Sequence, residues 1–402
     1  MSFEVSQRIV VVGGSLTGLR AIEALRRGGH AGEIVAICAE PHRPYDRPPL
    51  SKQFLKGDWQ EDRLWLRRQG EEDLAVDWRL GVAARSLDPV GRCVVLDDGS
   101  RVEYGGLIIA TGAAARALPA APELAGIHLL RTLDDARALR ADLASGGRLV
   151  VVGAGFIGME VAASARERGV EVIVVEALEA PLLRGLGRRL GDVVAARHRD
   201  RGVDIRCGIG VAGFTGRQRV EAVELSDGST VDATNVLVGI GVVPQVGWLS
   251  GSGLDVTNGV LCDASGATTL EHVVAAGDVA RWLDPRTGTA IRHEHWTSAV
   301  EQAGVAAARL LGGPGSVEPL AQVAYVWSDQ FEMRIAIAGE PAKGDALHVA
   351  HGSLDDDRFI ALLGREDRFV GAVSFGRPRP LNLCRELLER GAAFDEAIKS
   401  VG

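Results

Sequence analysis

Residues 149–158 read LVVVGAGFIG, an apolar run that leads directly into three glycines spaced as G-x-G-x-x-G. The apolar run predicts a buried strand, and the residues after it predict a helix through Arg168. In such a turn Gly153 allows the tight reversal and Gly155 lets a pyrophosphate approach the backbone, while Gly158 lets the helix pack on the strand. The helix N-terminus presents unpaired N–H groups to the phosphates. This stretch predicts a dinucleotide site.

An acidic residue follows at the spacing that such a site requires. A second strand, residues 172–175, ends at Glu176, about 20 positions after the glycines. A carboxylate there accepts hydrogen bonds from the ribose hydroxyls of NADH and repels the 2′-phosphate of NADPH, so Glu176 favours NADH. Arg184 is close enough in sequence to support the opposite interpretation, in which it binds that phosphate.

The same pattern occurs once more, at the start of the chain. Residues 9–18 read IVVVGGSLTG, and a predicted helix (19–27) and strand (34–38) lead to Glu40. Gly13 and Gly18 occupy the outer glycine positions, but Ser15 stands at the middle one. Taken alone, this copy is also compatible with an ordinary strand–helix turn. Two copies in one chain indicate a flavin and a nicotinamide held face to face.

Three further apolar strands end in small-residue turns. They are residues 107–112, ending in Thr111 and Gly112; residues 236–241, ending in Gly241; and residues 273–278, ending in Gly277 and Asp278. From about Gln322 the pattern changes. Strands at 358–364 and 369–375 flank a polar turn, and a helix at 381–390 follows, which predicts a separate α+β domain.

Composition excludes several classes of function. The chain has 402 residues, enough for about three domains, and its net charge of −8 argues against nucleic acid as a partner. The five cysteines are scattered singly, without C-x-x-C or C-x4-C spacing, so neither a local redox disulfide nor a metal site is expected. The longest apolar stretch, residues 149–165, is interrupted by glycines and Glu160. With no signal peptide before the first strand, we expect a soluble cytoplasmic protein that does not bind membranes.

Other short motifs follow in order along the chain. They are residues 43–52 (RPYDRPPLSK), 110–112 (ATG), 239–241 (GIG) with Pro244, 276–278 (AGD), 294–296 (EHW) and 327–330 (WSDQ). With the two glycine turns, they resemble the FAD-dependent, NADH-using ferredoxin reductases of oxygenase systems, the group of putidaredoxin, rubredoxin and biphenyl-dioxygenase reductases. The resemblance covers essentially the whole chain. It departs from the family pattern at Ser15, Gln245 and Ser298.

The resemblance implies an α/β fold like that of glutathione reductase, with two dinucleotide-binding domains and a C-terminal α+β domain. The implied FAD-binding domain comprises residues 1–112 and 245–320, the NAD-binding domain residues 113–244, and the C-terminal domain residues 321–402.

Individual roles follow from the resemblance. FAD would be held by Gly13, Ser15, Gly18, Glu40, Arg43, Lys52, Thr111, Gly112, Gly277, Asp278 and Trp296. NADH would be held by Gly153, Gly155, Gly158, Glu176, Arg184 and Gly241, with Arg184 on the adenine or pyrophosphate.

Four residues would serve catalysis: Lys52, Glu160, Trp296 and Trp327. Lys52 and Glu160 would form an ion pair near the flavin N5, and the tryptophans would lie near the isoalloxazine. The alternatives are a surface lysine, a helix N-terminal acid favoured by the dipole, and core aromatic residues.

The implied activity is hydride transfer from NADH to FAD, followed by single-electron transfer to a [2Fe–2S] or [3Fe–4S] ferredoxin. That ferredoxin would serve a cytochrome P450 or a ring-hydroxylating dioxygenase. Acidic ferredoxins require a local basic patch, for which the candidates are Arg63, Arg67, Arg68, Arg309, Arg334, Arg377 and Arg379.

Several other functions share the same motifs. A rubredoxin or monodehydroascorbate reductase has the same fold and cofactors. A quinone reductase at a membrane surface fits less well, since residues 385–399 are short and acidic. An NADH-sensing binding module, resembling apoptosis-inducing factor, is the alternative outside the enzymes.

Overall fold

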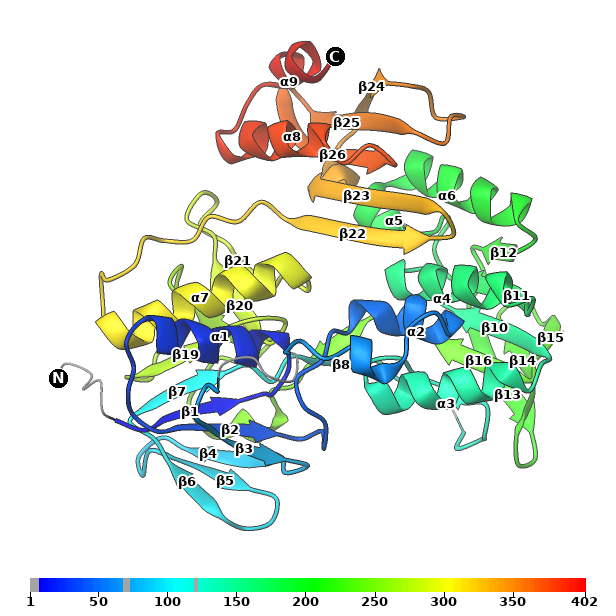
Figure 1. Ribbon diagram of the computed structural model, residues 1–402. Helices are drawn as coiled ribbons and strands as arrows, with labels where there is room; N and C mark the ends of the chain where they lie inside the picture. The colour runs from blue at the N-terminus through cyan, green and yellow to red at the C-terminus, as the bar shows by residue number, and fades with distance from the viewer. Residues whose placement is uncertain (1–6, 68–72, 119–121) are drawn as a thin grey trace. The chain divides into compact units, whose positions relative to one another are not determined.

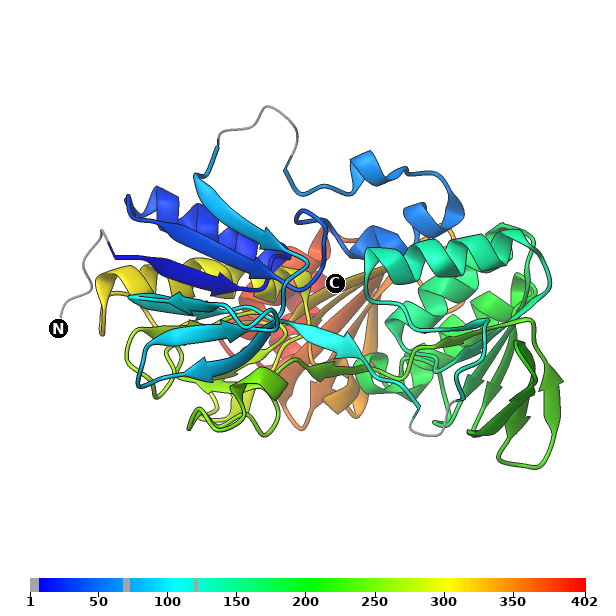
Figure 2. The same cartoon turned by 90° about the horizontal axis from the view of Figure 1, so that it is seen from below.

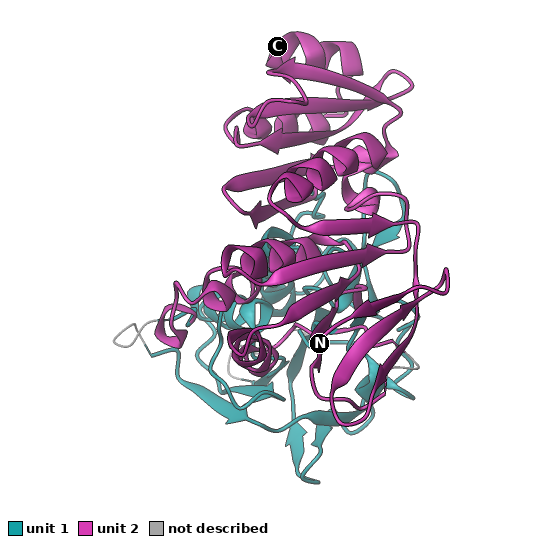
Figure 3. Ribbon diagram, turned by 90° about the vertical axis from the view of Figure 1, so that its right-hand side faces the viewer, with its two compact units in different colours: residues 1–46, 65–114, 243–322 teal, residues 47–64, 115–242, 323–402 magenta. Residues whose placement is uncertain are grey.

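The computed structural model describes residues 7–67, 73–118 and 122–402, and it divides into two compact units (Figures 1 and 3). Unit 1 contains residues 1–46, 65–114 and 243–322, and unit 2 contains residues 47–64, 115–242 and 323–402. Each unit is thus assembled from three segments that are far apart in the sequence. The short strands β8 (Ala113–Ala115) and β17 (Val242–Pro244) lie at two of the places where the chain passes between the units.

Unit 1 is built on a five-stranded parallel sheet. In spatial order the strands are β19 (Val273–Ala275), β7 (Gly106–Ile109), β1 (Ile9–Val12), β2 (Ile34–Cys38) and β3 (Val76–Leu80). Every residue of the first four strands is buried, which is typical of a parallel sheet covered on both faces. Helices α1 (Leu16–Arg27) and α7 (Trp296–Gly312) pack together, and Figure 1 shows both on one side of this sheet.

The rest of unit 1 consists of two small sheets. The antiparallel sheet of β4 (Ala84–Asp88), β5 (Cys93–Leu96) and β6 (Arg101–Glu103) places Leu87 and Val94 in the same apolar core as the parallel strands. The other sheet contains β18 (Val260–Cys262), β20 (Ala280–Leu283) and β21 (Ala290–Ile291).

Unit 2 contains a second five-stranded parallel sheet. Its spatial order is β12 (Asp204–Cys207), β11 (Glu171–Glu176), β10 (Arg148–Val152), β16 (Asn235–Val238) and β9 (Ile127–His128). The helices of this part are α3 (Leu133–Ala144), α4 (Phe156–Glu167), α5 (Leu183–Leu186) and α6 (Arg188–Asp200). An antiparallel sheet of β13 (Val211–Gly216), β14 (Val220–Leu225) and β15 (Thr230–Asp232) joins them, in green in Figure 2.

The alternation of side chains along β10 explains why this sheet has packing partners on both faces. Val150 and Val152 share a core with Val223 and Val231 of the antiparallel strands. Val151 points the other way, toward α4, where a Cβ placed on Gly158 would stand 3.2 Å from it. A continuous apolar strand is therefore buried on both sides.

The C-terminal part of unit 2 is an antiparallel sheet with two helices. The spatial order is β22 (Tyr325–Gln330), β23 (Met333–Gly339), β26 (Arg368–Phe375), β25 (Phe359–Arg365) and β24 (Ala346–His351). Helices α8 (Pro380–Glu389) and α9 (Phe394–Val401) bury Leu381 and Val401 against one face of it.

Unit 2 also includes a segment from the first part of the chain. Residues 47–64 form the short helices η1 (Pro48–Ser51), α2 (Gln53–Lys56) and η2 (Glu61–Arg63). The first two pack against α3 and α4.

The predicted β-turn-α-β units are both present, and the predicted hairpin is β25–β26. The first helix begins at Leu16, not at Leu19 as predicted, because Ser15 is already its extended N-cap residue. Among the elements that were not predicted are strands β3, β9 and β12 of the parallel sheets and helices α3, α6 and α9.

Candidate functional site

Three turns meet at the carboxyl-terminal edge of the parallel sheet of unit 1. They follow β1, β7 and β19, which are neighbours in the sheet. Gly13 has φ +122°, and a Cβ on it would stand 2.0 Å from the carbonyl oxygen of Ala110. A Cβ on Gly277 would stand 2.3 Å from Oγ1 of Thr17. Side chains at either glycine would force the turns apart, so the close approach of these turns requires glycine at both positions.

The turn after β1 accommodates its serine. Ser15 has φ −102° and ψ −159°, and Gly155 of the second copy has φ −74° and ψ −178°; both are extended conformations that any residue adopts. Gly18 does need to be glycine, since a Cβ there would stand 1.9 Å from the carbonyl oxygen of Gly13. Neither α1 nor α4 has a side chain capping its N-terminus. The arrangement therefore fits a phosphate at each helix start.

The remaining predicted residues of this edge lie beside these turns. The Thr111 hydroxyl donates to the backbone carbonyl of Gln245 at 2.8 Å, so the glutamine side chain plays no part in that bond. Gly112 has φ +66°, and Asp278 directly follows Gly277.

The loop that contains Arg43 is tied to two other elements of unit 1. The Tyr45 hydroxyl donates to Oε2 of Glu40, just beyond β2, at 2.5 Å. The indole N–H of Trp296, the first residue of α7, donates to Oδ1 of Asp46 at 3.0 Å. Arg43 itself is exposed. Glu40 and Trp296 thus hold this short loop at two adjacent residues, Tyr45 and Asp46.

Gln302 is a buried polar residue that the sequence reasoning missed. Its Oε1 accepts from the backbone N–H of Gly277 at 2.9 Å, and its Nε2 donates to Oε1 of Gln322 at 3.2 Å. Gln302 is 0% exposed, between the buried alanines Ala299 and Ala303 of α7. The signal in the sequence that could have identified Gln302 is a single amide side chain on an alanine-rich helix face.

The complete glycine turn in unit 2 has the predicted geometry. A Cβ on Gly153 would stand 2.5 Å from the carbonyl oxygen of Gly239, and one on Gly158 would stand 2.1 Å from that of Gly153. At Gly155 the nearest protein atom to such a Cβ lies 4.0 Å away, and Gly241, with φ +102°, has none within 4 Å. The outer glycines serve packing, whereas the other two leave space for a dinucleotide.

Glu176 lies directly at this turn. Its Oε2 accepts from the backbone N–H of Ala154 at 2.6 Å, and its Oε1 accepts from that of Leu178 at 2.8 Å. The backbone N–H of Leu182 donates to the carbonyl of Ala154 at 2.9 Å, so the exposed Arg184, two residues on, is held close to the same turn. The acid, the arginine and the glycines therefore gather at one edge.

Lys52 and Glu160 form a buried ion pair within unit 2. The Lys52 Nζ lies 2.8 Å from Oε2 of Glu160, and the two residues are 6% and 5% exposed. The Ser51 hydroxyl donates to the same oxygen at 2.6 Å, and the Ser328 hydroxyl donates to Oε1 at 2.7 Å. The alternative of a surface lysine is wrong, because Lys52 is buried. Its place beside a flavin stays a prediction.

Trp327 has a different environment. It packs, partly buried, against the core of the C-terminal sheet, with its ring centroid 6.3 Å from that of Tyr325. The guanidinium of Arg334 lies 5.8 Å from the Trp327 ring centroid. The core interpretation therefore describes part of this side chain, and its contact with a flavin stays a prediction.

The predicted docking arginines differ in how they are engaged. Arg63 lies over the Trp59 ring, and Arg67 pairs with Glu23 at 3.0 Å. Arg309 is half-buried, Arg377 and Arg379 are exposed, and Arg68 lies outside the described residues.

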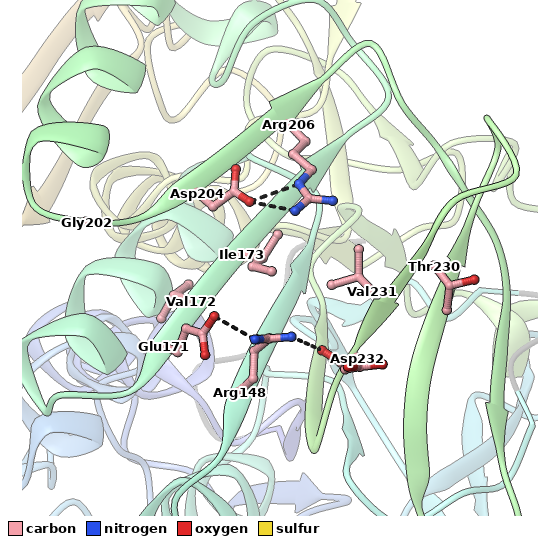
Figure 4. A pocket seen from close by; sticks show the side chains of 10 residues that line it. All are labelled: Arg148, Glu171, Val172, Ile173, Gly202, Asp204, Arg206, Thr230, Val231 and Asp232. Atoms are coloured by element: carbon pink, nitrogen blue, oxygen red, sulfur yellow. Dashed lines mark hydrogen bonds and ion pairs between the residues drawn. The ribbon is translucent and has the colours of Figure 1, made fainter.

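A cavity of about 310 Å³ is present elsewhere in unit 2 (Figure 4). Its lining residues include the first residues of β10, β11 and β12, so it lies at the amino-terminal ends of strands whose glycine turn follows the carboxyl-terminal end of β10. Arg148 pairs there with Glu171 at 2.8 Å, and Arg206 pairs with Asp204 at 2.8 Å. Because ligands of open α/β sheets bind at the carboxyl-terminal ends, this cavity is not the dinucleotide site.

The described part of the chain contains neither a cluster of potential metal ligands nor a disulfide. No group of His, Cys, Asp or Glu side chains there has an arrangement that could hold a metal ion. All five cysteines are free, and burial raises the pKa of the Cys38 and Cys384 thiols to about 12. None of the described helices has both the length and the apolar character that a membrane span needs.

Two family descriptions match nearly the whole chain. Residues 7–303 match the family described as "Pyridine nucleotide-disulphide oxidoreductase", and residues 325–399 match the family described as "Reductase C-terminal".

Individual relatives agree with these families. The rhodocoxin reductase of Rhodococcus erythropolis is 37% identical over 94% of this chain and 89% of its own length. The ferredoxin–NAD(+) reductase component of the anthranilate 1,2-dioxygenase system of Burkholderia cepacia is 36% identical over 96% of this chain and 95% of its own length. The reductase in a covalent putidaredoxin reductase–putidaredoxin complex has a TM-score of 0.90, with 31% identity, 96% of this chain and 93% of that chain covered. The chain therefore belongs to the pyridine nucleotide-disulphide oxidoreductase family, as an enzyme of its ferredoxin reductase group, which confirms the resemblance seen in the sequence and the fold class that it implied.

Proposed function

We propose that this enzyme takes a hydride from NADH onto FAD and passes single electrons to an iron–sulfur ferredoxin that serves a P450 or a ring-hydroxylating dioxygenase. The observation that carries the proposal is the pair of glycine turns, each followed by an acid at the end of the next strand, in a chain whose cysteines are all single and free. Two dinucleotides without a redox disulfide leave the flavin itself as the donor to the acceptor. Bound FAD accepts electron pairs and releases electrons singly.

The protein's own residues would bind and orient the two dinucleotides. Gly13, Gly18 and the start of α1 would hold the FAD pyrophosphate, and Glu40 the adenosine ribose. In unit 2, the glycine turn after β10 and the start of α4 would hold the NADH pyrophosphate. Glu176, fixed by two backbone N–H groups, would accept the ribose hydroxyls. Lys52 would bring positive charge to the ring, where negative charge develops as the flavin is reduced.

Support for an iron–sulfur acceptor comes from the relatives and from one surface. The names of the relatives include ferredoxin–NAD(+) reductases and a reductase bound to putidaredoxin. In the C-terminal sheet the backbone N–H of Gly376 donates to the carbonyl of Arg334 at 2.8 Å, so Arg334, Arg377 and Arg379 lie at one end of that sheet. We assign ferredoxin docking to these three arginines, which would attract an acidic partner. The unpaired cysteines are consistent with a reducing compartment, and we place the enzyme in the cytoplasm.

The test is anaerobic stopped-flow spectroscopy of the purified holoenzyme. The flavin band is followed after mixing with NADH and, separately, with NADPH. The reduced enzyme is then mixed with a [2Fe–2S] ferredoxin, a [3Fe–4S] ferredoxin, a rubredoxin or a quinone. We expect fast bleaching by NADH, slow bleaching by NADPH and rapid reoxidation by one of the two ferredoxins.

The contrary outcomes point to different alternatives. Reoxidation by a quinone or by rubredoxin alone would replace the ferredoxin by that acceptor. Reduction by NADH without rapid reoxidation by any acceptor would indicate an NADH-sensing binding protein. A protein that takes up no FAD would refute the whole proposal, because every step of it requires bound FAD.

A further inference from the structure

The carboxylate of Glu160 is held by more groups than an ion pair requires. Lys52 and Ser51 both bond to Oε2, at 2.8 and 2.6 Å, and both come from the segment that precedes α2. Ser328, on β22 of the C-terminal sheet, donates to Oε1 at 2.7 Å. Since both carboxylate oxygens are bonded and the residue is 5% exposed, the position of the charge is fixed from two sides.

The bond from Ser328 continues a longer chain of hydrogen bonds. Nε2 of Gln330 lies 3.0 Å from the Ser328 hydroxyl oxygen, and Oε1 of Gln330 lies 2.9 Å from Nε2 of His198 on α6. Ser328, Gln330 and His198 are each 0% exposed. Four residues from three elements are therefore linked without access to water.

The direction of every bond in this chain is determined by its chemistry. A carboxylate only accepts, so the single hydroxyl hydrogen of Ser328 goes to Glu160. Ser328 must then accept from Gln330, which places the Gln330 amide nitrogen toward the serine and its oxygen toward His198. The histidine Nε2 is consequently the donor. All donors point toward Glu160, an arrangement in which neighbouring bonds polarise one another.

The state of His198 is consistent with this direction. Burial lowers the pKa of His198 to about 4; the hydrogen bond with Gln330 opposes this shift, and the charge of Arg201 adds to it. The ring is therefore neutral at neutral pH, with its proton on the nitrogen that faces Gln330.

We propose that Ser328, Gln330 and His198 are positioning residues through which the C-terminal sheet fixes the Lys52–Glu160 ion pair for hydride transfer. The proposal rests on the proposed function, in which Lys52 stabilises the reduced flavin. It extends that function because it gives the C-terminal sheet a part in the reduction of the flavin, in addition to acceptor docking. A sequence that kept Lys52 and Glu160 but lost Ser328 would hold the carboxylate from one side only.

The test compares S328A with S374A in the FAD-loaded enzyme. Ser374 is a suitable control because it is buried in the same sheet, and its hydroxyl oxygen accepts from the backbone N–H of Arg377 instead. K52M reports whether the ion pair matters at all. S328C has a side chain of similar size that is still a weak hydrogen-bond donor. It replaces S328A in the comparison if S328A does not retain FAD. The readouts are the rate of flavin reduction at saturating NADH, the NADH dissociation constant and the two-electron midpoint potential of the bound flavin.

We expect S328A to be reduced about tenfold more slowly with an unchanged dissociation constant, since one of three donors to a charged group is lost. Its midpoint potential should become more negative by about 30 mV, the equivalent of tenfold for a two-electron couple. S328C should fall between S328A and wild type, and S374A should match wild type. A folding defect alone would leave the potential of the retained flavin unchanged.

Two results would overturn the inference, and they can be told apart. If K52M is slow while S328A and S328C match wild type in rate and potential, the hydrogen-bond chain has no role and the proposed function stands. If K52M itself matches wild type, the ion pair takes no part in hydride transfer, and both the inference and that part of the proposed function fail.

Discussion

The buried histidine of α6 makes the stability of unit 2 dependent on pH. His198 is 0% exposed, and its pKa is lowered to about 4 from an ordinary value of 6.5, mainly by burial. A group whose folded-state pKa is depressed binds fewer protons when folded than when unfolded. Stability from this histidine is therefore fully present above pH 6.5 and is lost as the pH falls toward 4.

The size of the effect follows from the two pKa values. At about pH 5 an unfolded histidine is almost fully protonated, whereas folded His198 is still about nine-tenths neutral. The difference in protonation between the two states destabilises the fold by about 2 kcal/mol between about pH 7.5 and about pH 5. H198Q removes this contribution, because an amide is neutral at both pH values and still donates a hydrogen bond.

Urea unfolding of wild type, H198Q and S374A at the two pH values measures this contribution. H198Q should lose about 2 kcal/mol less stability than wild type on acidification, while S374A should lose as much as wild type. Other titrating groups, among them His295, whose pKa burial also lowers to about 4, contribute equally to all three proteins and cancel. An equal loss in wild type and H198Q would show that the pKa of His198 is not lowered in the fold. The direction of its hydrogen bond would not change, because a protonated imidazole also donates from Nε2.

Three other predictions follow from the site. G18A should be purified without FAD, since its Cβ would stand 1.9 Å from a backbone carbonyl, whereas G304A, where no atom lies within 4 Å, should retain FAD; flavin absorbance per protein decides this. E176Q should raise the ratio of kcat/KM for NADPH to that for NADH by about tenfold, because the repulsion of a 2′-phosphate is removed; an unchanged ratio would assign specificity to another residue. The double variant R377E/R379E should slow ferredoxin association by about tenfold at low salt and leave reduction by NADH unchanged; stopped-flow traces that match wild type would exclude this surface.

Local backbone requirements explain how much of the fold could be predicted from the sequence. The glycine turns were predicted correctly because each outer glycine is required by contacts with residues nearby. An example is the close approach of Gly158 to the carbonyl of Gly153. Seven of the ten strands in the two parallel sheets were predicted, because burial on both faces leaves a continuous apolar run; β3, β9 and β12 were not. Strand β3 escaped prediction because it lies at the sheet edge, where Asp77 is exposed and the other four residues are only partly buried.

Long-range contacts explain what could not be predicted. Glu160 lies 108 residues from Lys52 and 168 residues from Ser328 in sequence, and no local pattern joins them. The resemblance suggested the first pair, but only the fold brings β22 against α4. Gln302 was missed for the same reason, since its partner Gly277 belongs to another element. Buried polar residues on otherwise apolar faces are the signal that such contacts leave in a sequence.

The serine in the first glycine turn shows why a motif is best judged position by position. The motif has glycine at three positions for different reasons. Only at the first and third positions would a side chain clash with the protein itself. Gly13 and Gly18 would bring a Cβ to 2.0 and 1.9 Å from backbone atoms, whereas Ser15 adopts an extended conformation open to any residue. What the middle position must provide is room for the ligand, and a serine takes little of that room while adding a hydroxyl donor. The departure at Ser15 is therefore compatible with a bound pyrophosphate, whereas a departure at Gly13 or Gly18 would not be.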